Sequence, residues 1–506
     1  MRKTIEGESA MGARKGIDYI QRLKEHPPET WIGKEKVTDP TAHPLIRPAV
    51  EATARLYDVQ WAEEHASYML HRSPDTGELV GTSFLVPRSK EDLYKRRLQS
   101  LIWAQQTFGL MGRSPDFLNA MLTVWYINRD FFGPYAENVK KYYEYVRDND
   151  LFLTHVLIDP QVDRSKPPSE QPDEYTYLGV VRETDGGIIV RGAKMLATSG
   201  PYADEVLVWP FHLRKPTEKD YKYAISFAVP LDTPGLRLIA REPYTRSSTL
   251  DHPLAARFDE LDAVAVFDDV FVPWERVFIY QDVERVNTIW KVNSNAFTGH
   301  QTSIRLLVKL QFLAGLLMKG TEMVQTNQFP HVQDMIGEVT TYIELVRAAI
   351  IASEATAEPN ADGIYMPNVV PLYAVRNSGN RWYPRVIEIM HLVFAGGLMY
   401  QPSSFDVFDS PIADDIRKYY RGATVSAEEK IRLFKLAQDL AISDFGSRHV
   451  LYERFYAGDP MFLRIQTQYS AYDKREALAL VERALALYRE EEAAKAEKPE
   501  AKEMKI

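Results

Sequence analysis

Residues 111–121 read MGRSPDFLNAM, and Arg113 within them is the first candidate for chemistry. A glycine precedes it, a Ser-Pro-Asp turn follows it, and an apolar run with helical spacing begins at Phe117. A permanent guanidinium at such a place is either a surface charge beside a helix cap or a group that faces an anion. On this stretch alone both interpretations stay open.

Three further segments carry groups that could bind a ligand. His155 lies in LFLTHVLIDP, where a helical pattern gives way to a strand or loop, and a lone histidine is more often structural than catalytic. Ala197–Gly200 reads Ala-Thr-Ser-Gly, a turn that can bring hydroxyls and backbone donors close to a ligand. A Gly-Asp-Pro turn begins at Gly458. None of the three is specific by itself.

Missing residue types exclude several kinds of chemistry. The chain has no cysteine, which rules out disulfides, thiolate zinc sites, cysteine-bound iron–sulfur clusters and cysteine nucleophiles. Its 11 histidines are scattered without an H-E-x-x-H spacing, so no metal site is expected. No G-x-G-x-x-G, Walker or G-x-S-x-G motif opens a βαβ unit. Redox chemistry would therefore need a bound organic cofactor, or a metal held by histidines and carboxylates.

Composition points to a globular enzyme-sized protein. The 506 residues are 45% hydrophobic and 26% charged, and their net charge of −9 argues against a general nucleic-acid binder. The longest apolar stretch, around 306–318, is interrupted by Lys309 and is too short to span a bilayer. No apolar core follows the charges at the start, so we expect a cytoplasmic protein without a membrane partner.

The elements that must position these groups fall into three parts. Apolar positions recur at helical spacing to about residue 150, with Ser89 and Asp92 as the expected cap of one helix. From about 151 to 285 the period becomes that of short strands, including two runs joined by Asp-Gly-Gly at 185–187, which predicts a compact β-barrel or sandwich. Long apolar-faced helices return over 286–490 and predict an antiparallel bundle, followed by a charged tail over 491–506.

Six motifs in this order resemble the large, oxygenase component of two-component aromatic hydroxylases that use reduced flavin. The motifs run from GIDYIQRLKEHPPETWIGKEKVTDPTAHP through MGRSPDFLNA, THVLIDPQVDRSKPPSEQPD, GAKMLATSGPYADEVLVWP and FDDVFVPWERVFI to LYERFYAGDP. This is the 4-hydroxyphenylacetate 3-monooxygenase family, which includes phenol and chlorophenol hydroxylases. The resemblance implies an α+β, acyl-CoA-dehydrogenase-like fold with N-terminal helices, a central β-barrel and a C-terminal four-helix bundle, assembled as a homotetramer. The related 4-hydroxybutyryl-CoA dehydratases need cysteine ligands, which this chain lacks.

The resemblance also implies the reaction. FAD reduced by a separate NADH-dependent flavin reductase would react with O₂ to a C4a-hydroperoxide, whose distal oxygen is transferred to a phenol ring. A missing nucleotide-binding motif is what such a reductase-dependent component should show.

Residue roles are carried over from the matching motifs. Arg113 and His155 match the groups that contact the phenol oxygen, and Thr198 matches a threonine near flavin N5. His300 is either a second base, as in some chlorophenol-type relatives, or a hydrogen-bonded core histidine. Further flavin contacts map to two segments: His155, Val156, Leu157, Gln161, Val162, Asp163 and Arg164, and Gly458, Asp459, Pro460 and Met461.

Two departures from the pattern bear on the substrate. Phe117 stands where the hydroxyphenylacetate enzymes have tyrosine, and Phe211-His212 stands where they have a Ser-Thr pair that holds the substrate carboxylate. Losing hydroxyl donors favours an uncharged ring. We therefore predict a simple phenol as substrate, hydroxylated ortho to give a catechol, and a place in the phenol and chlorophenol branch.

Three alternatives stay open. The substrate could be 4-hydroxyphenylacetate, with its carboxylate held elsewhere in the 211–222 loop, for instance by Arg214. The enzyme could instead attack chlorophenols or nitrophenols at the para position. From another class, the order of elements also suits an acyl-CoA-dehydrogenase-like enzyme that binds FAD tightly.

Overall fold

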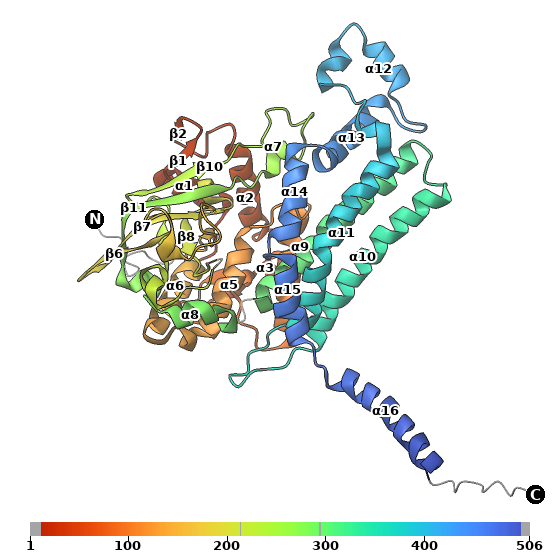
Figure 1. The fold of residues 1–506 in the computed structure, drawn as a ribbon. Helices are drawn as coiled ribbons and strands as arrows, with labels where there is room; N and C mark the ends of the chain where they lie inside the picture. The colour runs from red at the N-terminus through yellow and green to blue at the C-terminus, as the bar shows by residue number, and fades with distance from the viewer. Residues whose placement is uncertain (1–11, 213, 293–294, 497–506) are drawn as a thin grey trace, which may run out of the picture.

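The computed structural model describes residues 12–212, 214–292 and 295–496. Its first part is mainly helical, as predicted (Figure 1). Ser89 caps a helix there, because its hydroxyl accepts a hydrogen bond from the Asp92 backbone N–H at 3.1 Å. The helices are α1 (Gly16–Glu25), α2 (Arg47–Val59), α3 (Ala66–Met69), α4 (Lys90–Gln106), α5 (Pro115–Ile127) and α6 (Ala136–Asp148).

Strands of the second part build two sheets. One has six strands in the order β2-β1-β10-β11-β7-β6, and the other has four in the order β12-β9-β8-β5. The strands from the β-rich span are β5 (Leu153–Val156), β6 (Gly179–Thr184), β7 (Gly187–Met195), β8 (Glu205–Val208), β9 (Ser226–Pro230), β10 (Leu236–Ala240), β11 (Ala263–Pro273) and β12 (Val277–Ile279). Two sheets are the sandwich form of the predicted barrel or sandwich, whereas the family resemblance implied a barrel. Phe227 and Phe267 pack edge to face between them, with ring centroids 5.8 Å apart.

The six-stranded sheet also recruits residues expected to be helical. Strands β1 (Thr30–Ile32) and β2 (Glu35–Val37) form a hairpin, and β1 pairs in parallel with β10. Another short pair, β3 (Leu70–Arg72) and β4 (Leu79–Gly81), lies before α4. The predicted Asp-Gly-Gly hairpin is confirmed, since β6 and β7 are antiparallel and meet at Thr184 and Gly187.

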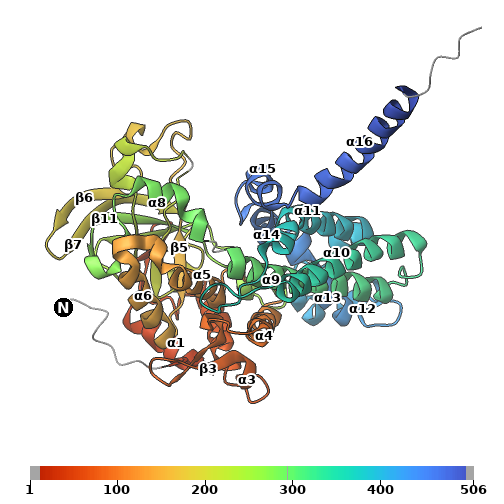
Figure 2. The same cartoon turned by 90° about the horizontal axis from the view of Figure 1, so that it is seen from below.

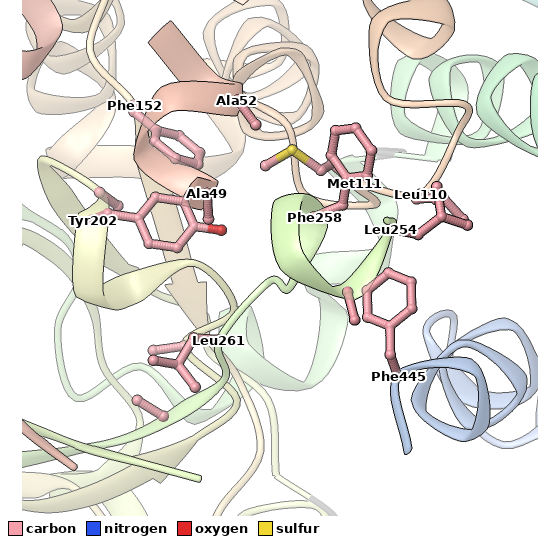
Figure 3. Packing of buried hydrophobic residues seen from close by; sticks show 14 of the residues in the cluster. Ala49, Ala52, Leu110, Met111, Phe152, Tyr202, Leu254, Phe258, Leu261 and Phe445 are labelled. Atoms are coloured by element: carbon pink, nitrogen blue, oxygen red, sulfur yellow. The ribbon is translucent and has the colours of Figure 1, made fainter. Parts of the chain in front are cut away.

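Long helices form the third part. They are α9 (Asn295–Met323), α10 (Pro330–Ala355), α11 (Val369–Phe394), α13 (Ala427–Ala441) and α14 (Asp444–Phe455), which pack side by side in both views (Figures 1 and 2). Shorter helices are α7 (Ala255–Phe258), α8 (Val283–Thr288), α12 (Ala413–Tyr419) and α15 (Pro460–Leu463). The helix α7 packs with Leu110 and Met111 on one side and with Phe445 of α14 on another (Figure 3). The apolar core is therefore continuous from the sheets to the bundle.

Helix α16 (Arg475–Ala496) extends away from the rest of the chain (Figure 2). None of its residues is buried, although it carries leucines and Tyr488 that are 42% to 68% exposed. The predicted charged tail starts inside this helix, and its residues 497–506 lie outside the described part of the chain. Across the described residues, no helix is both long and apolar enough to cross a membrane, and no group of three or more metal-ligating side chains was found.

Buried charges fix helices α9 and α14 against each other. Glu453 accepts hydrogen bonds from both terminal nitrogens of Arg305, at 2.6 and 2.9 Å, and from Lys309 Nζ at 2.8 Å. All three side chains are at most 1% exposed. Burial opposes the charged carboxylate, but Arg305 and Lys309 outweigh it and lower the pKa of Glu453 to about 2.

Glu453→Gln should destabilise the protein by roughly 3–5 kcal/mol, because it leaves two buried cations without their counter-ion. The measurement is the free energy of unfolding in urea at pH 7 and fixed protein concentration. Glu338→Gln is the matched control, since Glu338 pairs with Arg385 at 2.9 Å where both side chains are about one-third exposed. That change should cost less than about 1 kcal/mol. Equal small losses in both variants would contradict the assigned role of Glu453.

Candidate active site

Arg113 is buried at the start of α5, where the bundle meets the β-rich part. It is 8% exposed, and its backbone N–H donates to Glu260 Oε1 at 2.6 Å. Its guanidinium donates to Tyr452 Oη at 2.6 Å and to the carbonyl oxygens of Gly112 and Tyr456, each at 3.4 Å. All three acceptors are neutral. Among the residues that the structure describes, no carboxylate forms an ion pair with this guanidinium.

Gly112 explains the glycine of the GRSPD motif. A Cβ at this position would overlap the Tyr452 hydroxyl and ring. The residue before Arg113 must therefore lack a side chain for Arg113 and Tyr452 to meet. Burial raises the pKa of Tyr452 to about 12, with Arg113 and Arg305 opposing the rise, so the phenol of Tyr452 stays protonated at neutral pH.

Phe117 and His155 complete a cluster with Arg113. The Arg113 Cζ atom lies 4.0 Å from the Phe117 ring centroid, and that ring is 5.9 Å from the imidazole of His155. His155 projects from β5, and its buried Nδ1 has no hydrogen-bond partner among the described residues. Burial, and then the charge of Arg113, lower the pKa of His155 to about 3. The imidazole is therefore neutral at pH 7.

Thr198 occupies a tight turn between β7 and β8. Leu196 and Ser199 on either side have φ angles of 69° and 64°, which side chains other than glycine rarely adopt. Backbone hydrogen bonds in both directions between Ala197 and Ala263 hold the turn, and Thr154 Oγ1 donates to the Thr198 carbonyl at 2.7 Å. The turn is thus fixed beside His155. Local strain of this kind often occurs at functional sites.

An ion network connects the Thr198 turn to Arg113. The Thr198 hydroxyl donates to Asp262 Oδ1 at 2.7 Å, and Asp262 pairs with Arg448 of α14 at 2.7 Å. Arg448 also pairs with Glu260 at 3.3 Å, and Glu260 accepts the Arg113 backbone N–H. Three side chains, those of Asp262, Arg448 and Glu260, therefore join Thr198, the predicted flavin contact, to Arg113, the predicted phenol contact.

His300 is held elsewhere in the bundle. It lies in α9, 2% exposed, with Nε2 2.7 Å from Glu354 Oε1, and Arg97 reaches the same oxygen at 3.1 Å. This is the environment expected of a hydrogen-bonded core histidine. Its neighbour Gln301 donates to Asp116 Oδ1 at 3.2 Å, which connects α9 to the GRSPD turn.

The Phe211-His212 pair lies after β8, and its two side chains differ in exposure. Phe211 is 36% exposed, whereas the His212 side chain is 1% exposed. The two ring nitrogens of His212 face Asp159 Oδ2 at 2.7 Å and the Tyr223 carbonyl at 3.1 Å. Lys194 binds Asp159 at 2.9 Å and the Phe211 carbonyl at 2.9 Å. His212 is therefore occupied by the protein and has no free nitrogen for a substrate anion.

The remaining predicted flavin residues form two separate segments. Gln161, Val162 and Arg164 are exposed in the loop after β5, and Gly458, Asp459 and Met461 are exposed before and at the start of α15. The Asp459 carboxylate already accepts hydrogen bonds from the backbone N–H groups of Met461 and Phe462, so these two donors are not free for a ligand. Among the described residues no hydrogen bond or ion pair joins the two segments.

Family models match almost the whole chain. The model described as 4-hydroxyphenylacetate 3-hydroxylase N terminal matches residues 15–279, and the corresponding C-terminal model matches residues 286–486. The 4-hydroxyphenylacetate 3-monooxygenase oxygenase component of Thermus thermophilus is 43% identical over 91% of this chain and 95% of its own length. The 4-nitrophenol 2-monooxygenase oxygenase component of a Rhodococcus species is 34% identical over 92% and 90%.

Solved structures agree with these matches. The oxygenase component of 4-hydroxyphenylacetate 3-monooxygenase complexed with FAD and 4-hydroxyphenylacetate is 41% identical, with a TM-score of 0.88 over 94% of this chain and 100% of that chain. A 4-hydroxybutyryl-CoA dehydratase from N. maritimus, 24% identical, shares the fold with a TM-score of 0.80 over 90% of this chain and 91% of that chain. The predicted acyl-CoA-dehydrogenase-like α+β fold is confirmed at this level.

These matches place the chain in the class of oxygenase components of two-component aromatic hydroxylases. Within that class it belongs to the 4-hydroxyphenylacetate 3-hydroxylase family. The matches do not single out the phenol and chlorophenol branch that the sequence favoured. Relatives from Thermus and Geobacillus, at 43% and 40% identity, are hydroxyphenylacetate enzymes.

Several residues at the site escaped sequence reasoning. No role was predicted for Tyr452, which lies within LYERFYAGDP. None was predicted for the acidic run Asp259-Glu260-Leu261-Asp262, which precedes the strand β11. The usable signal was that run: three carboxylates in four positions ahead of a buried strand need buried cations. Arg448 and Arg241 supply them.

His155→Gln should make the protein less sensitive to acid. Because the folded-state pKa of His155 is lowered to about 3, the unfolded chain binds more protons than the folded one between pH 3 and 6.5. Wild-type stability therefore falls as the pH falls through that window. The equilibrium constant for unfolding rises roughly tenfold for each pH unit. Unfolding in urea at pH 7 and pH 4.5 measures the difference between wild type and variant. His331→Gln, at an exposed histidine, is the control, and identical pH dependence in all three proteins would refute the burial effect.

Proposed function

We propose that this protein uses reduced FAD and O₂ to hydroxylate a phenol ring ortho to its hydroxyl, with 4-hydroxyphenylacetate as the first substrate to test. Reduced FAD would come from a separate NADH-dependent flavin reductase. The family, and the naming of its relatives from Thermus and Geobacillus, support this choice over the simple phenol that the sequence favoured. Bound flavin would supply the activation of O₂.

The observation that carries the proposal is the unpaired charge of Arg113. A buried guanidinium normally has a carboxylate partner, whereas this one has only neutral acceptors and an aromatic face among the described residues. A phenol ionises near pH 10, so it binds mostly as the neutral form at pH 7. A guanidinium beside its oxygen favours phenolate, and phenolate is the more reactive nucleophile.

His155 would act with Arg113 on the phenol oxygen. Its Nδ1 is buried and has no hydrogen-bond partner in the described part of the chain, so a bound hydroxyl would satisfy a group that burial otherwise leaves unbonded. With its pKa lowered to about 3, the imidazole is neutral and can accept a hydrogen bond from the phenol. A phenolate beside it would raise its affinity for a proton.

The chain's own groups fit FAD. Thr198 presents a hydroxyl in a rigid turn, and Leu196 beside it leaves an apolar side chain 49% exposed. Gly458 has a φ of 110°, and a Cβ there would meet only Leu463 Cγ, at 4.0 Å, while Arg164 is exposed in the loop that would face a pyrophosphate. These residues, with Gln161–Asp163 and Asp459–Met461, are the proposed flavin contacts.

An uncharged phenol is the second candidate, and Phe211 is the observation that favours it. This exposed ring stands in the proposed substrate loop, and His212 beside it is engaged by Asp159 and Tyr223. A substrate carboxylate would need another partner, and Arg214 is exposed two positions further on. The relative named for 4-nitrophenol shows that the family includes substrates without a carboxylate.

Assembly of four copies is part of the proposal. Helix α16 exposes its apolar side chains along its whole length, and the flavin segments at 161–164 and 458–461 are exposed in the single chain. A neighbouring copy would cover both.

We expect hydroxylated product from purified protein, chemically reduced FAD and O₂, with 4-hydroxyphenylacetate giving its 3-hydroxy derivative. Phenol, 4-nitrophenol and 4-chlorophenol complete the panel, with products identified by mass spectrometry. Faster turnover of phenol than of hydroxyphenylacetate would select the second candidate, and para attack with loss of nitro or chloride would select the chlorophenol-type reaction. Tightly retained FAD that is reduced by an acyl-CoA thioester, with no hydroxylated product, would refute the proposal in favour of a dehydrogenase.

Arg113→Ala should uncouple oxygen use from hydroxylation, because the phenol loses the charge that stabilises its anion. A shift of one pKa unit in the bound phenol corresponds to about tenfold, so the ratio of product to hydrogen peroxide should fall about tenfold or more. Arg237→Ala, which removes an exposed arginine paired with Asp268, is the control. Unchanged coupling in Arg113→Ala would place Arg113 outside the phenol site.

A further inference from the structure

The hydroxyl of Thr198 has its single proton committed to Asp262. It donates to Asp262 Oδ1 at 2.7 Å, and the same carboxylate accepts hydrogen bonds from Arg448 at 2.7 and 2.9 Å and from Arg241 at 2.8 Å. Burial alone would raise the pKa of Asp262, but Arg448 and Arg241 outweigh it and hold the pKa well below the usual range. An ionised carboxylate only accepts, so Thr198 must be the donor.

The turn holds the backbone of Thr198 in place, so its hydroxyl stays beside the ionised Asp262 carboxylate. The Thr198 carbonyl accepts from Thr154, and Ala197 and Ala263 hold the chain in two backbone hydrogen bonds. The positive φ of Leu196 and Ser199 leaves little freedom on either side. The lone pairs of Thr198 Oγ1 are then the part of the hydroxyl that remains for a ligand, which makes the side chain an acceptor.

Acceptor character at this point distinguishes the two redox states of a flavin. In reduced flavin N5 carries a hydrogen and donates, whereas in oxidised flavin N5 has a lone pair and accepts. A threonine free to rotate its hydroxyl would suit both states. A threonine whose proton is held by a carboxylate can accept a hydrogen bond only from the N5–H of reduced flavin. Beside oxidised flavin, a lone pair of its hydroxyl oxygen would face the lone pair of N5.

We propose that Asp262 is a positioning residue that fixes Thr198 as a hydrogen-bond acceptor and so makes the site select reduced FAD over oxidised FAD. The inference rests on the proposed function, because it takes Thr198 to face flavin N5. A component without its own reductase domain must bind reduced flavin from solution and release the oxidised form, and a preference for reduced FAD favours both steps. Asp262 supplies this preference through one hydrogen bond.

Asp262→Asn is the decisive change. Asp262 Oδ2 faces the Nε atoms of both Arg448 and Arg241, whereas Oδ1 faces Arg448 Nη2 and the Thr198 hydroxyl. The amide NH₂ is therefore best accommodated at the Oδ1 position, where the hydroxyl can rotate and accept from it. Thr198 then turns its own proton toward the ligand and becomes a donor. The preference should shift toward oxidised FAD.

The experiment measures dissociation constants of oxidised FAD in air and of photoreduced FAD under anaerobic conditions, together with the midpoint potential of bound flavin. We expect the wild type to bind reduced FAD about tenfold more tightly or better, from one net hydrogen bond. For a two-electron couple, tenfold corresponds to a potential about 30 mV above that of free FAD. Asp262→Asn should abolish or reverse this difference.

Three further variants separate the orientation of the Thr198 hydroxyl from a general disturbance of the ion network. Asp259→Asn removes a carboxylate that also pairs with Arg241, at 2.6 Å, but forms no hydrogen bond with Thr198, so its preference should match the wild type. Thr198→Val removes the hydroxyl and should lower the preference. Adding Asp262→Asn to Thr198→Val should then change nothing more.

Each outcome decides the inference. A wild type that binds both redox states equally overturns it without any variant, as does an unchanged ratio in Asp262→Asn or a further change in the double variant. If Asp262→Asn does not fold, the wild type and Thr198→Val still test the inference. An unchanged ratio of the two dissociation constants in Thr198→Val would show that the hydroxyl does not contact N5. Failure to bind either form of FAD would instead refute the proposed function.

Discussion

Arg448 of α14 is the interaction on which the site depends. It lies between Glu260 and Asp262, at 3.3 and 2.7 Å, and so connects the helical bundle to the segment that enters strand β11. Glu260 holds the backbone of Arg113, and Asp262 holds the hydroxyl of Thr198. This buried arginine, with one carboxylate on each side, therefore fixes the distance between Arg113 in the N-terminal helical part and Thr198 in the β-rich part. Neither could be fixed by its own element alone.

Charge balance around this arginine explains why Arg113 can remain unpaired. Asp259, Glu260 and Asp262 face Arg241 and Arg448, which leaves one more negative than positive side chain beside the Arg113 backbone. Tyr452 adds a neutral acceptor and an aromatic face 5.3 Å from the Arg113 Cζ atom. Nearby negative charge thus stabilises the cation, while no carboxylate in the described part of the chain pairs directly with its guanidinium. A fully paired arginine would have little left for a substrate.

Local patterns predicted much of the fold, because they depend on neighbours in sequence. The Ser89 cap, the hairpin at Asp185-Gly186-Gly187 and the helix after Ser114-Pro115-Asp116 are confirmed. The parallel pairing of β1 with β10 was missed, since it joins residues about two hundred positions apart and leaves no local period. At the site, Arg113, Phe117 and His155 were brought together as expected. Asp262 and Arg448 were missed because nothing in the sequence near either residue shows that the folded chain brings the two together.

The position of Phe117 in the structure changes the inference about substrate charge that its sequence suggested. In the sequence, its replacement of a tyrosine removes a hydroxyl donor and so favours an uncharged phenol. The ring in fact lies against the guanidinium of Arg113 at 4.0 Å and beside His155, at the end of the site where the phenol oxygen would bind. A hydroxyl is already supplied there by Tyr452, 2.6 Å from Arg113 Nη1. Phe117 therefore bears on how the phenol oxygen is held, and it carries no information about a carboxylate at the other end of the ring. Phe211 and Arg214 bear on that choice, because the exposed Phe211 ring argues for an uncharged substrate ring and the exposed Arg214 for an acidic one.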